Sequence, residues 1–203
     1  MNFRRSQRGS ASVEAALIMP ILIGVTLLGA DLYTLHQARS YLEQSAHTLA
    51  STLGVQSTLD ANGLQALVDE ATRMTARLNT DLDPVPFELI VSKVEPDRSM
   101  AWRPLHRGGA SGICRANSAG AQYTGELPEV PRAADDDSDD EASDTDSSVV
   151  VVQLCTEVDR LVLSSLVLTD KTLQVQAVSR LQHGTPTLDK ALTQEVMPQG
   201  ETQ

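Results

Sequence analysis

Arg8-Gly9-Ser10-Ala11-Ser12-Val13-Glu14, near the start of the 203-residue chain, is the stretch that decides the fold. Directly after it, from Ala15 to Ala30, the sequence has no charged side chain. As a helix, the 21 residues from Ser10 to Ala30 would extend roughly 30 Å, which is the thickness of one hydrocarbon core. The sequence therefore predicts a transmembrane helix over residues 10–35.

The charges that flank this apolar segment are distributed unevenly. Arg4, Arg5 and Arg8 precede it, and Asp31 follows it directly. Basic residues are retained on the cytoplasmic side of membranes. We therefore expect the N-terminus in the cytoplasm and the rest of the chain, roughly 170 residues, on the other side of the membrane.

Glu14 is the one ionisable residue between Ser10 and Ala30. An unpaired charge in a membrane costs roughly 2.5–3.5 kcal/mol on insertion scales, so such a residue indicates a function and a partner. If the chain is cut between Gly9 and Ser10, the new α-amino group lies about one helical turn before Glu14. That ammonium could neutralise the Glu14 carboxylate of a neighbouring helix that is shifted along its axis.

This combination resembles a class III signal, the leader of type IV pilins. Gly9 precedes the cut, Ser10 follows it, and Glu14 becomes the fifth residue of the mature chain. The stretch Gly-Ser-Ala-Ser-Val-Glu-Ala-Ala after a short basic leader is most similar to TadE/TadF-like minor pilins (pseudopilins) of the tight-adherence (Tad/Flp) type IV pilus system. The specific likeness covers residues 4 to about 35, and it departs from the family at Ala15, where Phe is often found.

The resemblance implies that a prepilin peptidase removes a cytoplasmic leader peptide, residues 1–9, and that Glu14 contacts other subunits during assembly. The expected partners are this peptidase, other pilin-like subunits, the Tad inner-membrane assembly platform and membrane lipid. No cofactor is expected. The protein is expected to cross the bacterial inner membrane once, with its C-terminal domain in the periplasm, and to stay there or enter the pilus.

Alternatives remain open for both the segment and its function. A secretory signal peptide also joins a basic start to an apolar core, and Leu28-Gly29-Ala30 could be its cleavage site. An uncleaved membrane anchor is a further possibility. The functional alternatives are a minor pseudopilin of a type II secretion system, and a membrane-anchored periplasmic domain that binds calcium or a partner through an acidic loop.

The helices beyond the membrane follow from apolar residues at helical spacing. This spacing predicts that the first helix continues from residue 31 to about residue 53, and Gly54 is expected to end it. A second helix is predicted over residues 63–79, capped by Asp60 or Asn62. Residues 36–132 are therefore expected to form a helical stem and the first part of a periplasmic head.

The strands of that head are predicted from period-two alternation and from β-branched runs. The predicted strands cover residues 87–94, with one face buried, then 149–158 and 171–181. Residues 161–168 are apolar enough to belong to the core. The fold class is thus α+β and pilin-like, a long N-terminal helix followed by a head with a small antiparallel sheet, whose C-terminal strands lie within residues 149–183. A flexible tail, with a short helix at residues 188–196, is expected over residues 184–203.

Residues 133–148 are predicted to be a disordered acidic loop. Eight carboxylates lie between Asp135 and Asp146 with no basic residue among them, which accounts for most of the formal net charge of −11. Their spacing resembles an EF-hand, but Asp140 stands where that loop needs glycine, so no metal is assigned. The weak calcium candidates are Asp135, Asp137, Asp139, Glu141, Ser143 and Asp146.

Cys114 and Cys155 both follow the membrane segment. In the periplasm that the resemblance implies, two such cysteines are more often joined than free, so a disulfide between them is predicted. It would close a loop of about 40 residues, which chain-entropy estimates associate with roughly 3–4 kcal/mol of stability.

No pattern in the sequence indicates enzyme chemistry or nucleic-acid binding. There is no phosphate-binding loop, nucleophile elbow or zinc motif. The histidines lie far apart in the sequence, at His36, His47, His106 and His183. Basic residues and aromatics do not form a stripe. We therefore expect a structural protein that is not an enzyme and binds no nucleic acid.

Overall fold

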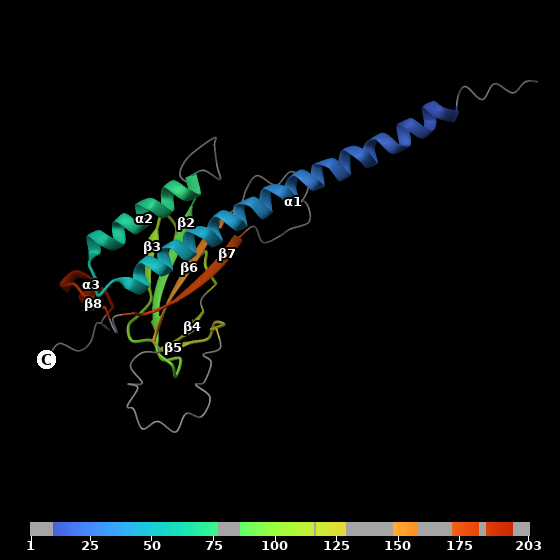
Figure 1. The fold of residues 1–203 in the computed structure, drawn as a ribbon. Coiled ribbons are helices and arrows are strands. Elements are labelled where there is room, and N and C mark those ends of the chain that lie inside the picture. Colours follow the sequence, from blue (N-terminus) through green and yellow to red (C-terminus); the bar gives the residue numbers. More distant parts are fainter. Residues whose placement is uncertain are drawn as a thin grey trace, which may run out of the picture. The chain divides into compact units, whose positions relative to one another are not determined.

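The computed structural model describes residues 10–76, 86–115, 117–128, 148–157, 172–182 and 186–196. Their order in the chain is a long apolar helix followed by short helices and antiparallel strands, which is the predicted α+β class (Figure 1). The chain divides into two units: residues 10–38 are described in the first, and the described residues from Arg39 onward form the second, the head.

Helix α1 (Ser10–Val55) is the continuous helix that the sequence predicts. Pro20 lies inside it without ending it, as membrane helices allow when the freed backbone carbonyl finds another partner. In the head, α1 buries one side. Its buried apolar residues follow helical spacing, at Leu42, Ala46, Leu49 and Leu53.

Gly54 does not end α1, because the helix continues to Val55. Its role is close packing. A Cβ atom on Gly54 would lie 2.9 Å from the carbonyl oxygen of Arg180 and would also meet the Ser179 side chain. The Gly54 carbonyl accepts a hydrogen bond from the N–H of Gln182 at 3.0 Å. Glycine therefore lets the end of a strand approach the end of the helix.

The four-stranded sheet of the head has the order β3-β2-β6-β7, with all neighbours antiparallel. Its two central strands, β2 (Phe87–Val94) and β6 (Val149–Glu157), were predicted nearly residue for residue. The edge strand β7 (Thr172–Arg180) was also predicted. The opposite edge, β3 (Leu105–Gly108), was not, because four residues are too few to show an alternation.

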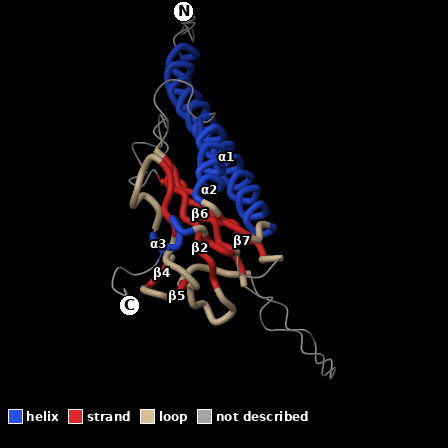
Figure 2. The backbone as a smooth tube through the Cα atoms, turned by 90° about the vertical axis from the view of Figure 1, so that its left-hand side faces the viewer, coloured by secondary structure: helices blue, strands red, loops and turns tan. Residues whose placement is uncertain are grey.

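One face of this sheet is covered by helices (Figure 2). Helix α2 (Ala61–Ala76) begins two residues before its predicted start, and the Asp60 carboxylate accepts the N–H of Gly63 at 2.5 Å as its cap. Together with the head portion of α1, it buries the main core. Members of that core include Leu42, Leu49, Leu64, Phe87, Leu89, Val152 and Leu154.

The other face of the sheet is covered as well, which the sequence analysis did not predict. All eight residues of β2 are buried, whereas its alternation was taken to mean one buried face. The described residues after β3, 109–115 and 117–128, supply the second cover, with a small hairpin of β4 (Ser118–Ala119) and β5 (Gln122–Tyr123). Tyr123 packs there in a smaller apolar cluster with Val94, Val149 and Val151.

The tail was expected to be flexible, and this is wrong for residues 186–196. Strand β8 (Thr187–Leu188) pairs in parallel with β1 (Thr58–Leu59). Helix α3 (Lys190–Val196), within the range predicted for a short helix, buries Leu192 and Val196 in the main core. Two apolar side chains at helical spacing are a weak signal in a polar sequence, so only the packing reveals their role.

Asp189 holds this C-terminal segment to the start of α2. One carboxylate oxygen accepts the N–H of Leu192 at 2.7 Å and the other accepts the N–H of Ala61 at 3.0 Å. These two N–H groups lower the pKa of Asp189 below its usual value. One side chain therefore caps both α2 and α3, although Asp189 and Ala61 are separated by 128 positions in the chain.

Some predictions fall outside the described residues. They concern the acidic loop over residues 133–147, the apolar stretch at residues 161–168, the second helix beyond Ala76, and the tail from residue 197 onward.

We expect Gly54→Val to lower the free energy of unfolding of the head by about 2–3 kcal/mol, because a branched side chain must displace the end of β7. The control is Gly109→Val, at a glycine with no atom within 4 Å of its Cβ position, and it should change stability by less than about 0.5 kcal/mol. Urea unfolding of the full chain in nonionic detergent, followed by fluorescence of the sole tryptophan, Trp102, measures both. Equal effects of the two variants would contradict the close-packing role.

Candidate functional site

From Val13 to Tyr33, helix α1 exposes large apolar side chains around its whole circumference. An 18-residue window in this helix has a mean hydropathy of 2.1, and none of it is buried. We call these side chains the apolar surface of α1. Its members are Val13, Leu17, Ile18, Met19, Ile21, Leu22, Ile23, Val25, Leu27, Leu28, Leu32 and Tyr33. A helix that is apolar all round is stable only inside a membrane or among other protein segments.

The size of this apolar surface decides whether the helix can insert into a membrane although it carries Glu14. Ten of its members are Leu, Ile or Val, and each favours the membrane by about 0.3–0.6 kcal/mol, or about 3–6 kcal/mol together. An ionised carboxylate would cost about 2.5–3.5 kcal/mol. Insertion therefore remains favourable with Glu14 charged, but neutralising Glu14 would make it considerably more favourable.

Two threonine hydroxyls of α1 are hydrogen-bonded within the helix. The Thr26 hydroxyl donates to the carbonyl oxygen of Leu22 at 2.8 Å, and Thr34 does the same to Ala30 at 2.9 Å. Such bonds remove the cost of placing a hydroxyl in lipid. Asp31, which the sequence analysis treated as a flanking charge, is only 4% exposed.

Glu14 is exposed and is the fifth residue of α1, counted from Ser10. The predicted cleavage site is described only in part: Ser10 begins the helix, while Gly9 and the rest of the leader lie outside the described residues. The spacing from Ser10 to Glu14 is one helical turn, as the sequence predicted.

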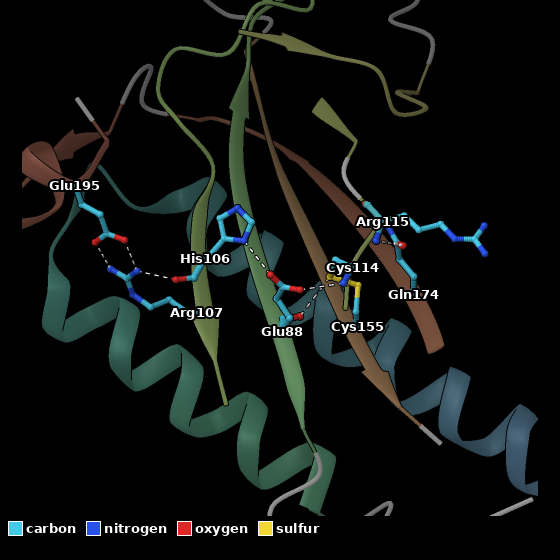
Figure 3. Close-up of polar contacts among 8 residues, drawn as sticks. All are labelled: Glu88, His106, Arg107, Cys114, Arg115, Cys155, Gln174 and Glu195. Atoms are coloured by element: carbon cyan, nitrogen blue, oxygen red, sulfur yellow. Dashed lines mark hydrogen bonds and ion pairs between the residues drawn. A yellow bond between two sulfur atoms is a disulfide. The ribbon is translucent and has the colours of Figure 1, made fainter. Parts of the chain in front are cut away.

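In the head, a buried polar group lies beneath the second cover of the sheet (Figure 3). Glu88, in the central strand β2, is only 1% exposed. One of its carboxylate oxygens is 2.9 Å from Nδ1 of His106 on β3, and the other accepts the N–H of Cys114 at 2.9 Å. Burial alone would raise the pKa of Glu88. The N–H groups of Cys114 and Gly112 and the His106 ring outweigh burial, so that the pKa lies below its usual value.

The predicted disulfide is present. Cys114 and Cys155 are joined, with their Cα atoms 5.4 Å apart and their positions separated by 41 in the sequence. Cys155 is fully buried in β6, and Cys114 is half-buried in the covering segment. The bond therefore attaches the second cover to a central strand.

A second charged residue of β2, Lys93, is also 1% exposed. Its Nζ is 2.6 Å from the carboxylate of Glu95, which also accepts the Ser148 hydroxyl at 2.5 Å. The sequence analysis missed Glu88 and Lys93 because polar residues that alternate with apolar ones in a strand normally face water. Nothing in the local pattern shows that both faces of β2 are covered. Glu88 lies on the face of the second cover, whereas Lys93, two residues after Val91, lies on the face of the main core.

Neither a metal site nor an assembled catalytic group is found in the part of the chain that the structure describes. No group of three His, Cys, Asp or Glu residues there is placed so that it could hold a metal ion. His36 and His47 are exposed on α1, His106 contacts Glu88, and His183 is not described. All of the calcium candidates between Asp135 and Asp146 also lie outside the described residues.

Residues 9–51 match the family model described as TadE-like protein. They are a TadE-like segment. The match begins at the predicted cleavage site, contains Glu14 and the whole apolar surface, and ends four residues before the end of α1. It confirms the predicted resemblance and extends it into the stem. No curated protein and no solved structure matches the chain.

The likeness to TadE-like proteins is found in this segment, residues 9–51. It covers most of the one described helix that is long and apolar enough to cross a membrane, Val13–Val55, which is consistent with a single-pass anchor. The head lies almost wholly beyond the match, so its chemistry has to be inferred from its own contacts.

We expect Glu88→Gln to destabilise the head by about 1–3 kcal/mol at pH 7, because charge-assisted hydrogen bonds to a buried carboxylate are lost. Since the pKa of Glu88 is lower in the folded than in the unfolded chain, its contribution is complete above pH ~4.5 and is lost as the pH falls through the folded value. The difference between the variant and the wild type should therefore shrink below pH ~4.

The matched control is Glu70→Gln, which changes an exposed carboxylate paired with Arg73 on α2. It should alter stability by less than about 0.5 kcal/mol. Urea unfolding between pH 3 and pH 7 measures both variants. If the effect of Glu88→Gln does not change over that range, ionisation of Glu88 does not stabilise the head.

Proposed function

We propose that this protein is a minor pilin-like subunit of a tight-adherence (Tad/Flp) pilus, anchored in the inner membrane with its head in the periplasm. A prepilin peptidase cuts it between Gly9 and Ser10, and it then takes part in pilus assembly. The observation that carries this proposal is that three features fall within one matched segment of the sequence. The TadE-like match covers the cleavage site, Glu14 and the apolar surface of α1.

The apolar surface supports this function because it suits two environments in turn. It is long enough for a hydrocarbon core before assembly. It can then pack against the apolar helices of other subunits, since lipid and a protein core are similarly apolar. An anchor alone would need the first environment, and it would gain nothing from a carboxylate at position 14.

Electrostatics gives Glu14 a role in that transfer. Cleavage would create an ammonium at Ser10, at the positive end of the α1 dipole, where a positive charge is unfavourable by about 0.3–1 kcal/mol. The Glu14 carboxylate of a neighbouring helix would relieve this repulsion and would itself be neutralised. Because Ser10 and Glu14 are one turn apart, pairing between copies shifts adjacent helices by about one turn and so sets their stagger.

A minor pseudopilin of a type II secretion system would have the same kind of leader peptide, cleaved in the same way. The family match favours the Tad system, because it names TadE-like proteins. No observation on the described residues favours a calcium-binding role.

We expect Glu14→Ala to leave membrane insertion intact and to reduce incorporation into pili at least about tenfold, because the ammonium of Ser10 loses its partner. The control is Glu43→Ala, an exposed carboxylate on the same helix that pairs with Arg39. It should assemble normally. Membrane fractionation and immunoblotting of sheared pili give the two readouts, and normal incorporation of Glu14→Ala would exclude the pairing role.

We expect Gly9→Leu to accumulate as a full-length precursor, because a bulky residue before the cut blocks the peptidase. N-terminal sequencing should show that the wild-type mature chain begins at Ser10, and that the variant retains residues 1–9. A wild-type chain that begins at Met1 or at Asp31 would instead indicate an uncleaved anchor or a secretory signal peptide.

A further inference from the structure

A short segment of the second cover crosses three strands of the sheet in a single row (Figure 3). We call residues 112–115 the strap. Glu88 of β2 is paired in register with Cys155 of β6, and Cys155 is paired with Gln174 of β7. The strap contacts all three of these side chains, so it is attached to β2, β6 and β7 side by side.

The three attachments differ in their chemistry. On β2, Glu88 accepts the N–H of Cys114 at 2.9 Å. On β7, the Gln174 amide accepts the N–H of Arg115 at 3.0 Å and donates to the Arg115 carbonyl oxygen at 3.3 Å. On β6, the attachment is the Cys114–Cys155 disulfide. Two of the attachments are thus reversible hydrogen bonds, and the covalent one lies between them.

Glu88 makes these attachments interdependent. It is a buried carboxylate whose hydrogen-bond donors are His106 of β3 and N–H groups of the strap. When the strap is in place, the charge is satisfied. When the strap moves away, the carboxylate loses donors that the sheet cannot replace, and water must reach it. An ionised Glu88 therefore favours the closed strap, and the disulfide keeps the strap closed.

We propose that the Cys114–Cys155 disulfide is a redox-controlled latch: oxidation holds the strap over Glu88, and reduction releases the strap while the four-stranded sheet stays folded. The sheet is expected to survive because its main core lies on the helix-covered face and contains no strap residue. The inference concerns the head alone and does not rest on the proposed function.

The chemistry of the latch is thiol–disulfide exchange. In reduction by dithiothreitol, its thiolate attacks Sγ of Cys114, the half-buried cysteine, and Cys155 leaves as a thiolate. The second thiol of the reagent then attacks the mixed disulfide and releases Cys114. The protein gains two electrons and two protons, and dithiothreitol becomes a cyclic disulfide. In oxidation by glutathione disulfide, two glutathione thiols form as the protein disulfide is made.

The test is hydrogen exchange of individual amides in the full chain in nonionic detergent, with and without dithiothreitol. On reduction we expect exchange at Cys114 and Arg115 to accelerate at least about tenfold, because their N–H groups lose their acceptors. Exchange at Val151 and Val152, in the centre of the sheet, should change less than about twofold. Reoxidation with glutathione disulfide should restore the protection of the strap.

The role of Glu88 is tested by the same measurement on Glu88→Gln. In the oxidised protein this variant should accelerate exchange at Cys114 by about threefold or more, because a neutral amide accepts more weakly than a carboxylate. In the reduced protein it should add no further acceleration, because the strap is already open. Gln174→Ala is the matched control in the same row, and it should accelerate Arg115 more than Cys114.

Three results would overturn the latch. The strap amides could stay protected in dithiothreitol, which would mean that hydrogen bonds alone hold the strap. Val151 and Val152 could lose protection together with the strap, which would make the disulfide a general support of the fold. Glu88→Gln could accelerate exchange equally in both redox states, which would show no coupling. If Glu88→Gln does not fold, reduction of the wild-type chain decides between the first two results and the latch.

Discussion

The rest of the structure depends on one constraint: the apolar surface of α1 must be kept out of water around its whole circumference. The head does not need to supply that cover if a membrane or neighbouring helices do. The helix can therefore carry only apolar side chains and self-bonded hydroxyls such as Thr26. Glu14 and the buried Asp31 are the charged residues in this part of α1. The position of Glu14 one turn from Ser10 relates a local electrostatic cost to the proposed assembly.

The head solves a different problem, because its sheet is covered on both faces. Helices cover one face with an ordinary apolar core. The other cover is a Gly- and Ser-containing segment with few large apolar residues, and it is held by polar and covalent attachments instead. Glu88, the Cys114–Cys155 disulfide and Gln174 provide them in one row. A thin cover of this kind can be ordered without a large core, but each attachment must be satisfied.

Prediction from sequence worked where a pattern was long. The helix from residue 10 to 55 and strands at 87–94, 149–157 and 172–180 all carry many repeats of their own period. It failed where elements were short or where burial came from distant residues. Strand β3 and the β4–β5 hairpin have too few residues to show a period. Leu192 lies in the core, and the short helix that carries it is capped by Asp189 together with α2, which is a contact between distant parts of the sequence.

The sequence by itself determined the apolar helix, the place of Glu14 in it, the pattern that predicts a cleavage site and the presence of two cysteines, because these can be read directly from the order of residues. Only the tertiary structure decided that Glu88 and Lys93 are buried, and that Cys114 reaches Cys155 beside Glu88. The physical reason is that burial and register depend on which segments pack together. A strand shows its alternation locally, but whether its polar face meets water or a second layer depends on a segment elsewhere in the chain.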